Sequence, residues 1–221
     1  MLALALVSLW PTNRGIVRML DFVREPAIYL AALLGVLAAL FAGRGKWIAV
    51  GLFAASAVIN LARMWPYTAL ASTQVPLPDE VSGMSCAEVL SFNVLQSNED
   101  YARTASLIER TRPDILLLME TNGDWLRALE PQLARYGYRL ARPLENTYGM
   151  IFATNLEVER ARMVANTSSN TPTLYATLRM GDGARFELVG LHPRPPRPGE
   201  NTQQRDANIA RAGAKTPDGI G

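Results

Sequence analysis

Cysteine and histidine are almost absent from this chain of 221 residues, and the part beyond residue 63 has no surplus of basic residues. Cys86 is the single cysteine, so an internal disulfide is excluded, while the redox compartment stays open. The first 63 residues hold six basic and two acidic side chains, which leaves 16 basic and 18 acidic ones beyond them. The sequence pI of about 8.8 therefore reflects the N-terminal third. The remainder lacks the basic surplus that coats nucleic acid, and no stable nucleic-acid partner is expected.

Charge is missing altogether from residues 27–43 and 47–62, two stretches rich in Leu, Ala and Val. Each is near the short end of what spans a bilayer, and the flanking Arg and Lys side chains can extend toward the membrane surface. We interpret the two stretches as transmembrane helices joined by a tight turn. The alternative, two buried core helices, needs a large protein around them. Residues 1–10 are apolar but too short to cross, so they form either part of a further span or an interfacial segment.

The positive-inside rule orients this membrane region, which covers residues 1–63. Arg44 and Lys46 lie in the turn between the two spans and place it in the cytoplasm, which sends the rest of the chain to the other side. The three Arg of residues 11–25 oppose this orientation because they then lie outside as well. We expect an extracytoplasmic soluble part, joined to the membrane by a Pro-containing linker over residues 64–86.

The pattern after the linker is that of an α/β domain. Val-Leu-Ser-Phe-Asn-Val at residues 89–94 predicts a short strand, and a helix capped by Asn98 follows it. Asp-Ile-Leu-Leu-Leu-Met-Glu-Thr at residues 114–121 predicts a strand that is buried on both faces and ends at Glu120. Two strands joined by a helix pair in parallel, so Asn93 and Glu120 are expected at the same edge of a sheet. Taken alone, a glutamate in this position more often marks only the point where a core strand meets water.

Further strands follow a second helix. Residues 125–133 predict an amphipathic helix broken near Pro131, strands are predicted over residues 138–141, 148–154 and 156–164, and residues 174–180 and 184–191 predict a hairpin around Gly181-Asp182-Gly183. The last strand ends at His192, the single histidine of the chain. A lone histidine more often lies at a surface than in a catalytic site. Here it occupies the end of a strand, as Asn93 and Glu120 do, and the three together are more informative than any one of them.

Four short motifs resemble a known family in their order and spacing. They are Ser-Phe-Asn-Val at residues 91–94, Arg-Pro-Asp-Ile at residues 112–115 running to Glu120, Tyr-Gly-Met at residues 148–150, and Gly-Leu-His-Pro at residues 190–193. Residues 87–211 resemble the first half of an endonuclease/exonuclease/phosphatase domain of the DNase I-like superfamily. The resemblance implies an α/β fold, the first half of a two-sheet α/β sandwich preceded by transmembrane helices.

The resemblance also implies roles for individual residues. Asn93 matches a family asparagine of the metal and catalytic site, Glu120 matches the metal-binding glutamate, and His192 matches the catalytic histidine that contacts the scissile phosphate. Tyr148 lies on a strand that lines the substrate site. The implied cofactor is Mg²⁺ or Mn²⁺, and the implied substrate is a phosphate ester whose class stays open. Hydrophobic spans ahead of such a domain resemble a bacterial membrane-anchored subgroup, which implies the bacterial inner (cytoplasmic) membrane as the location and the membrane as a partner.

The second half of the family pattern does not occur in this sequence. Neither its Gly-Asp-x-Asn motif nor its terminal Asp-His pair is present, and residues 212–221 form a tail without a strand pattern. Asp218 does not replace the missing aspartate because it lies in a Pro-Asp-Gly turn with no core strand before it. We interpret the chain as truncated. Half of a sandwich is expected to expose one whole apolar face, which predicts a marginally stable and catalytically silent domain.

Three hypotheses follow from the sequence. The first is a membrane-anchored, metal-dependent phosphoesterase. The second is a catalytically inactive membrane remnant or pseudoenzyme. The third is a membrane-tethered binding module that presents the Pro-rich residues 195–198 as a polyproline ligand.

Overall fold

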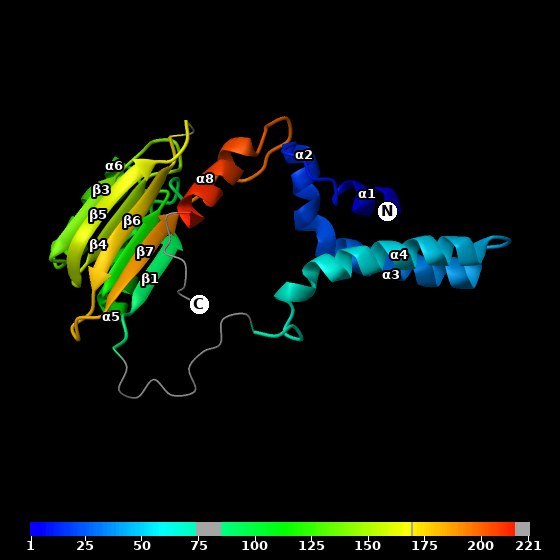
Figure 1. The fold of residues 1–221 in the computed structure, drawn as a ribbon, viewed down its shortest axis with the longest axis horizontal. Helices are drawn as coiled ribbons and strands as arrows, with labels where there is room; N and C mark the ends of the chain where they lie inside the picture. Colours follow the sequence, from blue (N-terminus) through cyan, green and yellow to red (C-terminus); the bar gives the residue numbers. More distant parts are fainter. Residues whose placement is uncertain (74–84, 169, 215–221) are drawn as a thin grey trace. The chain divides into compact units, whose positions relative to one another are not determined.

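The computed structural model describes residues 1–73, 85–168 and 170–214, and these form two compact units. The helical unit comprises Met1–Pro78 together with Pro195–Gln203, and the α/β unit comprises Asp79–Arg194 together with Gln204–Gly221. Figure 1 shows the helices and strands of each unit.

The helical unit is built around an antiparallel helical hairpin. Its elements are α1 (Leu2–Val7), α2 (Gly15–Arg18), the 3-10 helix η1 (Met19–Val23), α3 (Arg24–Phe41), α4 (Lys46–Met64) and the 3-10 helix η2 (Trp65–Tyr67). Helices α3 and α4 lie side by side along their length, joined by a turn in which Gly45 has a φ of +87° (Figure 1). Glycine adopts this left-handed conformation without steric cost.

Two helical segments of this unit are long and apolar enough to cross a membrane. They are Gly15–Phe41 and Lys46–Tyr67, and only 11% of the apolar window of each is buried within the structure. Buried core helices would be covered by protein, so this exposure disfavours the core-helix alternative. The observed helices contain the predicted spans, except that α3 ends at Phe41, two residues before the predicted end at 43, because residues 42–45 form the turn.

Residues 195–203 are held against the N-terminal segment of the helical unit. The Gly15 N–H donates to the Glu200 carbonyl at 2.8 Å, the Thr202 N–H donates to the Asn13 carbonyl at 2.7 Å, and Arg14 forms an antiparallel bridge with Asn201. The two backbones approach so closely that a Cβ atom on Gly15 would lie 2.0 Å from the Arg197 carbonyl oxygen. Only glycine therefore fits at position 15.

In its described residues, the α/β unit contains two sheets and four helices. Its strands are β1 (Val89–Asn93), β2 (Ile115–Met119), β3 (Tyr138–Arg142), β4 (Met150–Thr154), β5 (Glu157–Ala165), β6 (Pro172–Arg179) and β7 (Arg185–Leu191), and its helices are α5 (Tyr101–Thr111), α6 (Gly123–Ala128), α7 (Glu130–Leu133) and α8 (Gln203–Gly213). The first sheet has the order β1-β2-β4-β3, and the second has the order β5-β6-β7. Strands β1 and β2 are parallel, as the β-α-β pattern predicts, and the other pairs are antiparallel.

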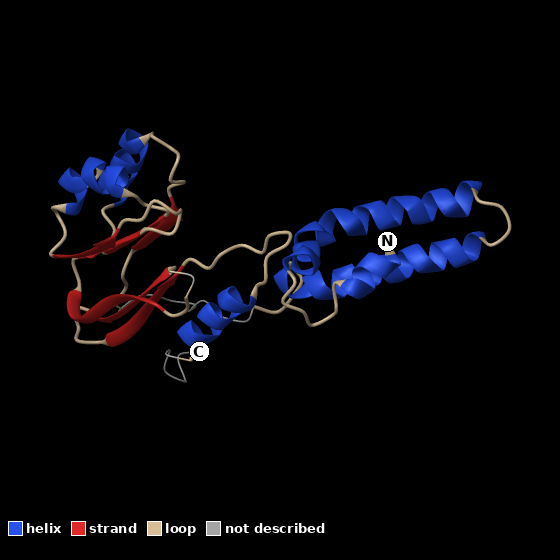
Figure 2. Cartoon of the chain, turned by 90° about the horizontal axis from the view of Figure 1, so that it is seen from above, coloured by secondary structure: helices blue, strands red, loops and turns tan. Residues whose placement is uncertain are grey.

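The core lies on both sides of β2. Leu116 and Leu118 face the helices and pack in a cluster with Trp125, whereas Ile115 and Leu117 face the second sheet. Alternate residues of a strand point to opposite faces, so one strand supplies both clusters. Figure 2 shows the resulting layers, with helices on one face of the first sheet and the second sheet on its other face.

The expected exposed apolar face is not found, and that prediction is wrong. Among the large apolar side chains in the described part of the α/β unit, only Val89, Leu95 and Ile209 are exposed. The reason is the distribution of the strands. They divide between two sheets that pack face to face, so this part of the chain already buries the inner face of each sheet.

Some local predictions also needed correction. Helix α5 is capped by Asp100, whose carboxylate accepts the Arg103 N–H at 3.1 Å, because Asn98 instead accepts the Asp100 N–H. Helix α8 continues to Gly213, past the predicted start of the irregular tail at residue 212, because Ala212 is buried. The rest of the predicted tail, residues 215–221, lies outside the described residues. The predicted hairpin is confirmed, and Gly183 supplies its turn with a φ of +88°.

The two-sided burial of β2 predicts a large loss of stability when its side chains are shortened. Ile115→Ala, at a fully buried position, is expected to lower the free energy of unfolding by about 2–5 kcal/mol. Ile209→Ala, at a position 39% exposed on α8, is the matched control and should cost less than about 1 kcal/mol. The measurement is urea unfolding of the full chain in detergent micelles, followed by fluorescence in a background that keeps only Trp125. Equal losses in both variants would contradict the packing described above.

Candidate functional site

Two polar side chains meet where β1 and β2 end. Asn93 is the last residue of β1 and pairs in register with Met119, so Glu120 follows directly beside it. The Asn93 side-chain Nδ2 donates to Glu120 Oε1 at 2.5 Å. The parallel pairing thus brings the two residues to the same edge, as the sequence predicts.

Glu120 occupies an unusual backbone position. Its φ is +64°, in the left-handed region that a residue other than glycine adopts at a cost of roughly 1–2 kcal/mol. This conformation turns the chain away from the sheet immediately after β2. The second carboxylate oxygen, Oε2, accepts the Gln96 N–H at 3.4 Å, and the Leu95 N–H donates to Asn93 Oδ1 at 2.8 Å. The carboxylate is therefore fixed by an amide side chain and by the loop that follows β1.

His192 approaches the same carboxylate from the second sheet. It follows β7, and its Nε2 lies 3.8 Å from Glu120 Oε1, with 20% of the histidine side chain and 16% of the glutamate side chain exposed. Burial lowers the pKa of His192 below its usual 6.5, and the nearby Glu120 charge opposes this shift only partly. The imidazole is therefore mainly neutral at pH 7. Its Nδ1 is buried and makes no hydrogen bond to the described residues.

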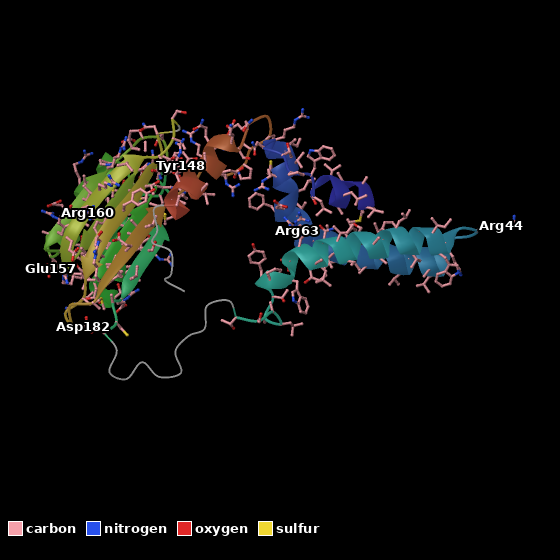
Figure 3. The ribbon with its side chains drawn as sticks, in the orientation of Figure 1. Arg44, Arg63, Tyr148, Glu157, Arg160 and Asp182 are labelled. Atoms are coloured by element: carbon pink, nitrogen blue, oxygen red, sulfur yellow. The ribbon has the colours of Figure 1, made fainter. Side chains whose placement is uncertain are left out.

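Tyr148 and Arg194 complete one side of the cluster. The rings of Tyr148 and His192 have centroids 5.4 Å apart at an angle of 43°, and the guanidinium carbon of Arg194 lies 5.0 Å from the centre of the Tyr148 ring. Tyr148 is only 6% exposed, so its ring packs beneath the histidine and the arginine. Figure 3 shows Tyr148 at one end of the sheets and Asp182, in the hairpin turn, at the other.

Two further residues shape the site, and the sequence did not single out a role for either. A Cβ atom on Gly149 would lie 1.7 Å from the Thr121 carbonyl oxygen, so the absence of a side chain lets β4 approach the turn after Glu120. Gln96 accepts the Thr147 N–H at 2.6 Å and so links the loop after β1 to the start of β4. The Tyr-Gly-Met motif included Gly149 but did not explain why a glycine is needed there. Nothing in the sequence distinguishes Gln96 from other loop residues.

The donor set accommodates a hard divalent ion at Glu120. Mg²⁺ keeps several waters and needs only one or two protein carboxylates. Glu120 supplies one that is held in place and partly open to solvent. Across residues 1–73, 85–168 and 170–214, no three His, Cys, Asp or Glu side chains gather to form a larger ligand set. The Asn93 amide nitrogen donates to the Glu120 carboxylate, and the Asn93 oxygen accepts the Leu95 main-chain N–H, so Asn93 holds the carboxylate in this geometry.

Comparison with known families identifies the class of this domain. Residues 90–220 match the model of the Endonuclease/Exonuclease/phosphatase family, which covers more than half of the chain. The chain therefore belongs to this family. No curated protein matches the sequence.

Several solved structures are similar to part of this chain. TDP2 of D. rerio, complexed with a single-strand DNA product, has 15% sequence identity and a TM-score of 0.50, and the match covers 59% of this chain and 56% of that one. An endonuclease/exonuclease/phosphatase from Bacteroides vulgatus has 14% identity and a TM-score of 0.47, with 58% and 59% covered. The human Nocturnin catalytic domain with bound sulfate has 18% identity and a TM-score of 0.43, with 60% and 61% covered. This chain spans about half the length of the first of these structures.

The burial of His192 predicts its titration. Because this is the single histidine, its ring protons can be followed by NMR in the full chain without ambiguity. We expect a pKa below 6.5, and a still lower pKa in Glu120→Gln, since that carboxylate raises it. Glu157→Gln, at the start of β5, should leave the titration unchanged.

The same shift has a consequence for stability. Between the folded pKa and 6.5, the unfolded chain binds more protons at His192 than the folded chain does. The contribution of this residue to stability is therefore unchanged above pH 6.5 and falls on acidification below it. A His192 that titrates at or above 6.5 in the wild-type chain would contradict the burial of its ring.

Proposed function

We propose that this protein is a metal-dependent hydrolase of phosphate esters. The observation that carries the proposal is the meeting of Asn93, Glu120 and His192, three residues distant in sequence, at the ends of β1, β2 and β7. Family membership supports a hydrolase of the phosphoesterase or nuclease type in general. The class of phosphate ester is not specified by these residues.

Glu120 and Asn93 form the part of the site that would hold a metal. Glu120 would bind Mg²⁺ or Mn²⁺ through its carboxylate, and a bound ion would offset negative charge on the phosphoryl oxygens. The Asn93 amide keeps that carboxylate oriented through its 2.5 Å hydrogen bond. The main-chain N–H of Gln96 supports the other carboxylate oxygen. Preorganisation of this kind lowers the cost of assembling the site around substrate.

His192 contributes a neutral imidazole at the edge of the cluster. A neutral ring donates from one nitrogen and accepts at the other. We assign it the role of donating a hydrogen bond to a phosphoryl oxygen. Burial keeps the ring uncharged, and Tyr148 fixes its plane from below. Arg194, stacked over Tyr148, adds a positive charge near the position where the phosphate would lie.

The residue that activates the attacking water is not among these side chains. Among the described residues, Glu120 is the single carboxylate that lies within 4 Å of His192. In this proposal, Glu120 already serves as the metal ligand. A pseudoenzyme that binds metal without turnover is therefore the second candidate. The third hypothesis, a polyproline ligand, is less well supported, because the adjoining residues 200–202 pair with residues 13–15 through main-chain hydrogen bonds and the Arg197 carbonyl lies against Gly15.

Two apolar helices support the proposal that the protein is anchored in a membrane. Their exposed apolar surface and their lengths suit a bilayer, and Arg44 and Lys46 at the hairpin turn suit a cytoplasmic position for that turn. We propose the bacterial inner membrane as the location, with the α/β unit on the extracytoplasmic side.

Hydrolysis and metal binding can be tested separately on the full chain in detergent. With bis-p-nitrophenyl phosphate and Mg²⁺, Glu120→Gln and His192→Gln are each expected to lower kcat/KM on the order of 10²-fold or more. Glu157→Gln is the matched control and should hydrolyse at the wild-type rate. Unchanged hydrolysis in both site variants would contradict the proposed site.

Metal binding has its own readout in the single histidine. Mn²⁺ is expected to broaden the His192 ring resonances, and Glu120→Gln should remove the effect. Broadening without any hydrolysis would favour the pseudoenzyme. Absence of both would contradict the proposal.

Cys86 provides a test of the orientation. It is exposed, lies at the end of the linker and is the single cysteine, so a membrane-impermeant maleimide reports its side of the membrane. We expect labelling of Cys86 in intact spheroplasts. Gly43→Cys in a Cys86→Ser background, which moves the thiol to the hairpin turn, should be labelled only after the membrane is permeabilised. The reverse pattern would place the α/β unit in the cytoplasm.

A further inference from the structure

A hollow lies at the end of the helical hairpin opposite the α3–α4 turn. Its volume is about 570 Å³, and its walls come from α2, η1, the start of α3, the end of α4 and η2. The polar side chains that line it are Arg18, Asp21, Arg24, Glu25, Arg63 and Tyr67. Figure 3 shows Arg63 near this end and Arg44 at the far turn. Charged side chains from separate segments therefore converge on one hollow beside two apolar helices.

Arg24 lines the hollow and is buried and held in place by hydrogen bonds. It is 5% exposed, and it donates to Asp21 Oδ1 from Nε at 3.0 Å and from Nη2 at 2.6 Å. Its Nη1 donates to Asn60 Oδ1 at 3.2 Å, and Asn60 is held in turn by the Ser56 carbonyl at 2.9 Å. A buried guanidinium is tolerated when its donors are satisfied in this way. Asp21 is paired with Arg24, so its charge is offset within that pair and is not counted against Arg18 and Arg63.

In the described part of the chain, the positive charges of Arg18 and Arg63 are not offset by a paired carboxylate. Among the described residues, neither forms an ion pair with a carboxylate. Glu25 is the one other acidic group of the hollow, and it accepts the Tyr29 hydroxyl at 3.5 Å. Once the Asp21–Arg24 pair is set aside, two guanidinium groups face one carboxylate. The hollow is thus suited to an anion of low charge.

The surroundings of the hollow suit a lipid better than a free anion. Phe22, Met64 and Pro66 supply apolar walls, and Phe22 is 69% exposed. Trp65 and Tyr67, at the same end of the hairpin, are 47% and 88% exposed. Aromatic side chains concentrate at the depth of the headgroups in membrane proteins. A phosphate bound here would have acyl chains beside α3 and α4.

We propose that this hollow binds the phosphate group of an anionic phospholipid. Arg18 and Arg63 hold the phosphodiester oxygens, while the acyl chains lie along the exposed apolar surface of the hairpin. Basic pockets beside membrane helices recognise anionic headgroups by this chemistry. The site is independent of the Asn93, Glu120 and His192 cluster, and it assigns a use to arginines that oppose the positive-inside rule.

The test measures which lipid stays bound to the full chain. The protein is equilibrated in micelles with phosphatidylglycerol and phosphatidylcholine in equal amounts, and the retained lipid is counted by native mass spectrometry. Phosphatidylglycerol is expected to be enriched on the wild-type chain. Arg18→Gln and Arg63→Gln should each reduce the enrichment about fivefold, which corresponds to about 1 kcal/mol for one basic side chain at an anionic surface.

Arg44→Gln is the matched control because it removes the same charge from the far end of the same hairpin. Enrichment that survives in Arg44→Gln and falls in the other two variants, at unchanged helix content by circular dichroism, supports the proposal. Equal loss in all three variants would show that net charge alone attracts the lipid, and the proposal would fail. A separate titration with inorganic phosphate in lipid-free micelles distinguishes the source. Binding of phosphate without any lipid enrichment would also overturn it.

Discussion

The burial of strand β2 from both sides is the constraint that arranges the α/β unit. Five consecutive apolar residues, Ile115–Met119, cannot be covered by one layer, because alternate side chains point in opposite directions. The helices α5, α6 and α7 cover one face and the second sheet covers the other. Glu120 is the first residue after this buried strand. The left-handed backbone at this residue turns the chain abruptly and leaves its carboxylate at the edge where β1 ends and His192 arrives.

The sequence was sufficient to predict the main elements and to place Asn93, Glu120 and His192 at the ends of their strands. The run around β2, the parallel partner β1 and the hairpin β6–β7 each have a local signature in side-chain periodicity or turn residues. The placement of β4 between β2 and β3 has no such signature, since it depends on long-range pairing. The resemblance implied two sheets, but which strands form each sheet was not predicted, and so the burial of their inner faces was missed. Sequence periodicity marks which residues are buried but not which partner buries them.

The arrangement of the site depends on details that follow only from tertiary structure. The direction of the Asn93 amide is decided by the Leu95 N–H, and the role of Gly149 is decided by a carbonyl that approaches from the turn after β2. Tyr148 was predicted to line the substrate site, and the structure places its ring under His192 and Arg194. Burial lowers the pKa of His192 and so favours its uncharged form, whereas the neighbouring Glu120 carboxylate alone would favour the charged form.

The contact between residues 13–15 and residues 197–202 makes the helical unit discontinuous along the chain. A shortened protein that begins at residue 87 would look like a natural choice for producing the α/β unit alone. Such a piece would keep residues 195–203 while deleting the backbone that Glu200 and Thr202 bind. In the loop between β7 and α8, the Glu200 carbonyl and the Thr202 N–H would then have to form hydrogen bonds with water. A fragment meant to fold alone must therefore take account of the main-chain pairing with residues 13–15 as well as the linker before β1.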